Sequence, residues 1–172
     1  MKINKLKNII KESYIKEIGD LKNIETYPYN KESMRNYSFD SNLGEVSVHF
    51  DTVTPFNFQI IKVKNTDFNP QEDEQYNISF DIGGTQSQFT KSNYSELVKI
   101  VATVKEIIDN FIKTYSPYSL LIIGVDKKGK IKTYKQKNTL YLMIATKNIP
   151  QGYRLSEAVA FEVEGYILFK ES

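Results

Sequence analysis

Apolar and polar residues alternate over three segments in the first half of the chain, at 46–50, 56–63 and 76–82. Successive side chains of a β-strand point to opposite faces, so this alternation is typical of strands with one buried side. Polar stretches that contain proline separate the segments and indicate turns or loops. The pattern therefore predicts three consecutive strands that pair as a meander.

The spacing changes between 94 and 115, where apolar residues recur every three or four positions as in an amphipathic helix. Their main face comprises Tyr94, Leu97, Val98, Val101, Val104, Ile108, Phe111, Ile112 and Tyr115. Asn93 and Glu96 have the spacing of a capping box, in which two side chains satisfy backbone N–H groups at the helix start. Ile100 and Ile107 lie off the main face, so we expect this helix to be buried on more than one side.

After this helix, an apolar run at 120–125 predicts a fully buried central strand. Two structures compete for the next segment. A turn at 126–129 would return the chain as a strand at 130–135, whereas the apolar spacing over 130–147 predicts an amphipathic helix. The helix is favoured because 140–145 continues the apolar spacing beyond a plausible strand.

The two ends of the chain add three elements. Residues 3–18 have helical apolar spacing and stop at Gly19, which predicts an amphipathic N-terminal helix that packs on the domain or docks on a partner. Strand-like runs at 153–155 and 158–169 close the chain. We expect Gly165, inside the second run, to mark a β-bulge or bend.

Length and composition are those of one globular domain. The 172 residues include 40% apolar residues, enough for a substantial core. We expect residues 1–22 to form the N-terminal helix and residues 23–172 a single α+β domain. Its sheet is expected to be curved and mostly antiparallel, with helices packed on it.

Composition also excludes several classes of site. The absence of cysteine excludes disulfides, thiolate metal sites and a thiol nucleophile. No apolar run reaches the roughly 18–20 residues that span a bilayer, and no secretory apolar stretch follows the basic N-terminus. We therefore expect a location in the cytosol or inside a particle. A net charge of +2 predicts no nucleic-acid partner by itself.

Candidate catalytic and metal-binding residues are few. His49 is the only histidine and lies on the polar side of its strand beside Asp51. Because no strained serine or threonine motif accompanies it, we expect an ordinary surface histidine. Four acids between 65 and 75 lack the spacing and the glycine of a calcium loop, so we expect a solvated loop, no metal and no zinc site. They are Asp67, Glu72, Asp73 and Glu74.

Two further features suggest phosphate contacts. Gly83 and Gly84 precede the long helix, but neither a P-loop nor G-x-G-x-x-G is present, so we expect a turn. A lysine cluster interleaved with tyrosine is expected to be a solvated helix face, with weak, sequence-independent nucleic-acid binding as the alternative. Its lysines are Lys127, Lys128, Lys130, Lys132, Lys135 and Lys137.

The order strand, long helix, buried strand, amphipathic helix and closing strand pair, over 76–169, resembles the C-terminal half of the GNAT family of N-acetyltransferases. That resemblance implies acetyl-CoA as cofactor, held near Gly83 and Gly84, and Tyr134 as general acid. The family holds the cofactor's pyrophosphate on an R/Q-x-x-G-x-G/A turn, and the matching stretch here, 86–93, contains no glycine.

The pattern over 46–169 also resembles a group of small tailed-bacteriophage proteins, through the helix at 98–112 and the apolar strand after Pro117. That resemblance implies phage origin and a location in the virion or the host cytoplasm.

The favoured hypothesis from the sequence is a non-catalytic phage protein, a virion structural or accessory component that binds other phage proteins or itself and needs no cofactor. Its expected surfaces are the N-terminal helix and an exposed tyrosine edge, Tyr27, Tyr29 and Tyr37. The alternative is an acyl-CoA-dependent N-acetyltransferase with a degenerate cofactor loop.

Overall fold

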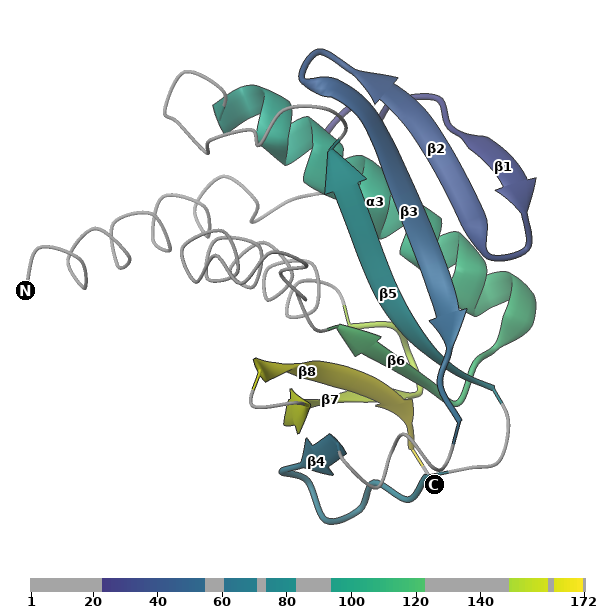
Figure 1. Cartoon of the computed structure of the whole chain (residues 1–172), viewed down its shortest axis with the longest axis vertical. Coiled ribbons are helices and arrows are strands. Elements are labelled where there is room, and N and C mark those ends of the chain that lie inside the picture. Colours follow the sequence, from purple (N-terminus) through teal and green to yellow (C-terminus); the bar gives the residue numbers. More distant parts are fainter. Residues whose placement is uncertain are drawn as a thin grey trace, which may run out of the picture.

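The structure, a computed structural model, describes residues 23–54, 61–70, 74–82, 94–122, 149–160 and 163–171 (Figure 1). Within these residues eight strands form one sheet and one helix lies against it, so the expected α+β class is confirmed. The elements are β1 (Asn30–Ser33), β2 (Asn36–Ser41), β3 (Gly44–Thr52), β4 (Ile61–Val63), β5 (Gln75–Ile82), α3 (Tyr94–Tyr115), β6 (Ser119–Ile122), β7 (Tyr153–Ala160) and β8 (Val163–Lys170). The helices predicted at 1–22 and 130–147 lie outside the described residues.

The described strands lie in the order β1-β2-β3-β5-β6-β8-β7-β4. Neighbours are antiparallel except for β5 and β6, which are parallel and are joined in sequence through α3. Parallel neighbours need a crossover connection, and α3 is part of that connection. Figure 1 shows α3 running along one face of β2, β3 and β5, while β6, β8, β7 and β4 continue the sheet below them.

The predicted meander is wrong in one respect, because β4 does not lie between β3 and β5. Instead β3 pairs directly with β5, and β4 pairs with β7 at the far edge of the sheet. The alternation of apolar residues specifies which face of a strand is buried but not which strand lies beside it. With three residues, β4 carries little information about its neighbour.

An unpredicted hairpin, β1 and β2, precedes the strands read from the sequence. It places Tyr37 in the core, with 4% of its surface exposed. Tyr27 stacks on Phe39, and Tyr29 meets Tyr37 edge to face. The predicted exposed tyrosine edge is therefore wrong for Tyr37, while Tyr27 and Tyr29 are half-buried with their rings packed on the core.

The main core lies between α3 and the sheet. Phe111 of α3 stacks on Phe50 of β3 with ring centroids 3.9 Å apart. The helix is also buried on a second side, as predicted: Ile100 has 1% of its surface exposed, and Ile107 is fully buried. On that side the backbone N–H of Tyr27 donates to Thr103 Oγ1 at 3.0 Å, so the segment before β1 crosses α3.

A second apolar cluster lies on the opposite face of the sheet, over β6, β8 and β7. Its buried members are Leu121, Ala158, Ile167 and Phe169, with Val53, Ile61, Val63 and Phe68 packed against them. Both faces of this half of the sheet are therefore covered, which explains why β6 is apolar at nearly every position.

The β7–β8 hairpin contradicts one of the two predictions for Gly165, the bulge. The two strands pair without a register shift from Tyr153 opposite Lys170 to Ala160 opposite Val163. Gly165 pairs with Ala158 inside this regular ladder, so it marks no bulge.

Candidate functional site

Most residues singled out from the sequence as site candidates lie outside the described part of the chain. These are Gly83, Gly84, Glu72, Asp73, Tyr134 and the lysine cluster between 127 and 137.

The first candidate is the fork, by which we mean the end of the parallel ladder that β5 and β6 share among the described residues. This ladder covers three positions, from Gln75 opposite Ser119 to Asn77 opposite Leu121. Beyond it, β5 is described as far as Ile82, paired with β3 on its other side, and β6 as far as Ile122. Figure 1 shows the two arrows diverging from this point.

The first turn of α3 is tied to neighbouring segments by the Glu96 carboxylate. It accepts hydrogen bonds from the backbone N–H of Asn42 at 3.0 Å, from Asn42 Nδ2 at 3.2 Å and from the hydroxyl of Tyr27. Burial, and then the hydrogen bond to Glu96, raise the pKa of Tyr27. Asn93, the other half of the predicted capping box, lies outside the described residues.

His49 takes part in a short chain of hydrogen bonds on the face of the sheet away from α3. Its Nδ1 lies 2.7 Å from Asn36 Oδ1, and Asn36 Nδ2 donates to Ser33 Oγ at 2.9 Å. The expected position on the polar side of β3 is confirmed, and His49 is half-buried there. Asn36 was not singled out from the sequence, because only the pairing of Asn36 with His49 places it there.

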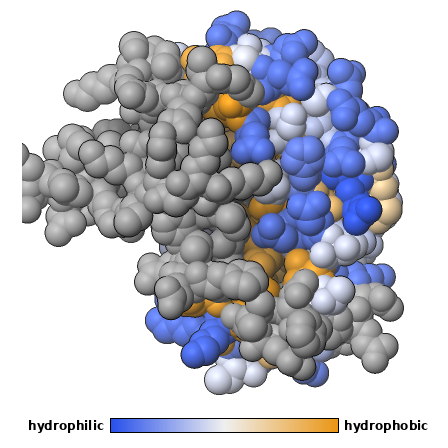
Figure 2. All heavy atoms as spheres, in the orientation of Figure 1, coloured by the Kyte–Doolittle hydropathy of each residue, from blue (hydrophilic) through white to orange (hydrophobic). Residues whose placement is uncertain are grey.

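The surroundings of His49 are polar. The side chains that alternate with the buried residues of β2, β3 and β5 are Asn36, Ser38, Asp40, Glu45, Ser47, His49, Asp51, Asn77, Ser79 and Asp81. No lysine or arginine belongs to this set of described residues. Figure 2 shows hydrophilic residues gathered over the part of the sheet turned to the viewer.

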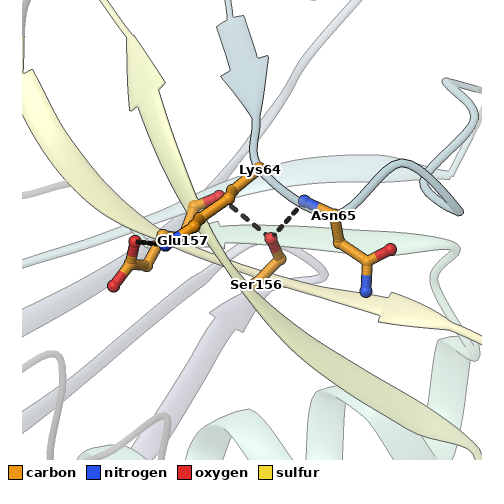
Figure 3. A network of polar contacts seen from close by, with 4 residues as sticks. All are labelled: Lys64, Asn65, Ser156 and Glu157. Carbon is orange, nitrogen blue, oxygen red and sulfur yellow. Dashed lines mark hydrogen bonds and ion pairs between the residues drawn. The ribbon is translucent and has the colours of Figure 1, made fainter.

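The acidic loop predicted from the sequence is tied to β7 where the structure describes it. Asp67 pairs with Arg154 at 2.9 Å, and Lys64 pairs with Glu157 at 3.2 Å. Asn65 N–H donates to Ser156 Oγ at 2.9 Å (Figure 3). Within the described residues, no group of three or more histidines or acids is placed to hold a metal ion.

Comparison with known proteins gives no assignment: no family model, no curated protein and no solved structure matches this chain. In the part of the chain that the structure describes, no helix combines the length and apolar character needed to cross a membrane.

Proposed function

We propose that this chain binds an acyl-CoA thioester in the fork between β5 and β6, on a core with the GNAT order of elements. The observation that carries the proposal is the parallel pair β5 and β6, at the centre of the strand order β3-β5-β6-β8-β7. In sequence α3 follows β5 and precedes β6. β3 pairs antiparallel with β5, and β8 pairs antiparallel with β6. The hairpin β7–β8 continues the sheet toward β4.

The chemistry of the fork fits the pantetheine arm of CoA. The parallel strands β5 and β6 are joined through α3, so their carboxyl ends lie at the same edge of the sheet. Ligands of open sheets with such crossovers bind outside the carboxyl ends of parallel strands. An extended ligand that carries amide groups can lie along a strand there.

The proposed reaction is transfer of the acyl group to an amine, with Tyr134 protonating the departing thiolate. The stretch 86–93 contains no glycine, so the pyrophosphate would lack the family's usual anchor. Binding is therefore the part of the proposal that the fork supports, and the transfer step rests on the sequence resemblance.

A thermal-shift titration tests binding. Acetyl-CoA that binds only the native state at 100 times its Kd raises stability by about 2.7 kcal/mol. We expect a dose-dependent rise in Tm with acetyl-CoA and CoA, and none with adenosine diphosphate at equal concentration. No rise at millimolar acetyl-CoA would contradict the proposal.

The transfer step has its own test. Tyr134→Phe is expected to reduce the rate of acyl transfer at least about 100-fold, in the range of general acid catalysis, while Tm shifts with acetyl-CoA persist. Tyr141→Phe is the matched control and should keep the rate. An unchanged rate in Tyr134→Phe would remove that residue from the mechanism.

A second proposal is that the chain is a phage component that acts by protein contact. It is favoured by β1, the outermost described strand on its side of the sheet, in which all four residues are exposed. An exposed edge can accept a strand from another chain. Light scattering across a hundredfold range of concentration tests self-association. A constant monomer mass, together with no phage protein retained by immobilised chain, would contradict this proposal.

A further inference from the structure

Four side chains on β3 and β5 form a compact polar group on the face of the sheet away from α3. His49 lies opposite Ser79, and Asp51 lies opposite Asn77. Residues two apart on a strand are about 7 Å apart, and directly opposed Cβ atoms are about 5 Å apart. A small ligand placed over the centre of this quartet is thus within reach of all four side chains.

The hydrogen bonds of Asn36 determine which nitrogen of His49 is free to accept. Asn36 donates through Nδ2 to Ser33, so its Oδ1 faces His49 and accepts from Nδ1–H. In the neutral imidazole the other nitrogen, Nε2, then carries a lone pair. Since Nδ1 is turned toward β2, the Nε2 lone pair is directed away from that strand.

The rest of the quartet also offers acceptors. Asp51 is exposed, and no described residue pairs with its carboxylate. Asn77 Oδ1 is buried and accepts no hydrogen bond. Unsatisfied buried acceptors are rare in folded proteins, and each one calls for an explanation, such as a bound group that supplies the donor. Ser79 adds a hydroxyl that can donate or accept.

Charge favours a cation at this position. The exposed acids on this face of β2 and β3 are Asp40, Glu45 and Asp51. Asp40 and Glu45 lie directly opposite each other, an arrangement that costs stability because like charges repel. None of the described residues of β2, β3 and β5 on this face is a lysine or an arginine.

We propose that the quartet His49, Asp51, Asn77 and Ser79 is a binding site for an alkylammonium group. A primary ammonium has three N–H donors and one positive charge, which matches His49 Nε2, the Asp51 carboxylate and one of the two β5 side chains. Free polyamines and lysine side chains of a polypeptide share this group. The site does not depend on binding of CoA.

The single histidine supplies a reporter for the test. The imidazole Cε1–H signal in a carbon–proton NMR spectrum comes from His49 alone. The titration is run at pH 8, where alkylammonium groups are charged. We expect the signal to move saturably with butylamine and with spermidine. Tetramethylammonium, which has the charge but no N–H, should not move it.

Variants locate the site. Asp51→Asn is expected to raise the half-saturating amine concentration about tenfold, the loss of one charge-assisted hydrogen bond. Glu106→Gln, on the exposed side of α3, is the matched control and should bind as the wild type does. Each variant is first checked for an unchanged Tm, so that unfolding cannot imitate lost binding.

A parallel titration with a lysine-containing peptide distinguishes the two sources. Saturation at a lower concentration than with spermidine assigns the site to a polypeptide lysine, and the reverse order assigns it to free polyamine. The proposal is overturned if the His49 signal moves with neither, if tetramethylammonium moves it equally, or if Asp51→Asn binds like the control.

Discussion

Tyr153 buries its ring where β7 begins and donates its hydroxyl hydrogen to the carbonyl oxygen of Pro117, between α3 and β6. The contact joins the last hairpin to the loop that follows the helix. Burial raises the pKa of Tyr153 to about 12, because the ionised phenolate would lose its hydration. The contact between β7 and the loop before β6 therefore depends on Tyr153 keeping its phenol protonated.

The pH dependence follows from the direction of that shift. The folded pKa lies above the ordinary value of 10.0, so this contribution to stability is complete below pH 10 and is lost as pH rises toward about 12. Tyr153→Phe is expected to lower stability at pH 7 by about 1 kcal/mol, through the lost hydrogen bond, and to show a smaller further loss between pH 10 and pH 12. Urea titrations at pH 7, 10 and 11.5 measure both effects. Equal alkaline losses in both proteins would contradict the assignment.

Phe111 is fully buried in the main core. It stacks on Phe50 and meets Tyr76 edge to face, so its removal leaves a cavity between α3 and the sheet. Phe111→Ala is expected to cost about 3–5 kcal/mol of unfolding free energy. Thr114→Ala, exposed on the same helix, is the control and should change stability by less than about 0.5 kcal/mol.

At the scale of elements, the segment after β4 covers the second apolar cluster and is held by two kinds of contact. Its ion pairs are exposed: the side chains of Arg154 and Asp67 are 44% and 61% accessible. Phe68 meets Phe169 edge to face with ring centroids 5.4 Å apart. Exposed ion pairs contribute about 0–1 kcal/mol, less than a buried aromatic contact.

The two contributions can be separated by mutation. Phe68→Ala is expected to destabilise the protein by about 1–3 kcal/mol, whereas Arg154→Ala should cost less than about 1 kcal/mol and lose even that in high salt. Chemical unfolding at low and high salt measures both. If Arg154→Ala proved the more harmful, the segment would be held by charge instead of apolar contact.

The sequence predicted where helices and strands lie along the chain better than it predicted which strands pair with each other. The bounds of α3 follow from a strong apolar period and from Pro117, both local features. The position of β4 beside β7 could not be predicted, because three residues such as Ile61–Val63 fit many neighbours. The alternation of Tyr37 and Phe39 with polar residues was a signal for β2 that could have been used, whereas the exposed β1 shows no such alternation.

The candidate sites were less predictable still. His49 and Asp51 were visible as polar residues of a strand, but their partners Asn36, Ser79 and Asn77 come from other strands. Only the register brings those residues together. The fork likewise depends on which strand lies beside β5, and that is a property of the whole sheet.

At the scale of the whole molecule, the sheet differs between its two halves. In the half made of β6, β8, β7 and β4 both faces carry apolar clusters, whereas β2, β3 and β5 carry one apolar and one polar face. The fork lies where these halves meet. A ligand bound there would touch the edge of β5, with α3 on one face of the sheet and the polar quartet on the other.

Hydrogen exchange of β5 with and without acetyl-CoA tests the central claim most directly. We expect slower exchange at amides of β5 between Asn77 and Ile82, because a ligand bound in the fork would cover this part of the strand. The amides of β1 should exchange unchanged and serve as the internal control. Exchange along β5 that stays the same at saturating acetyl-CoA would contradict binding in the fork.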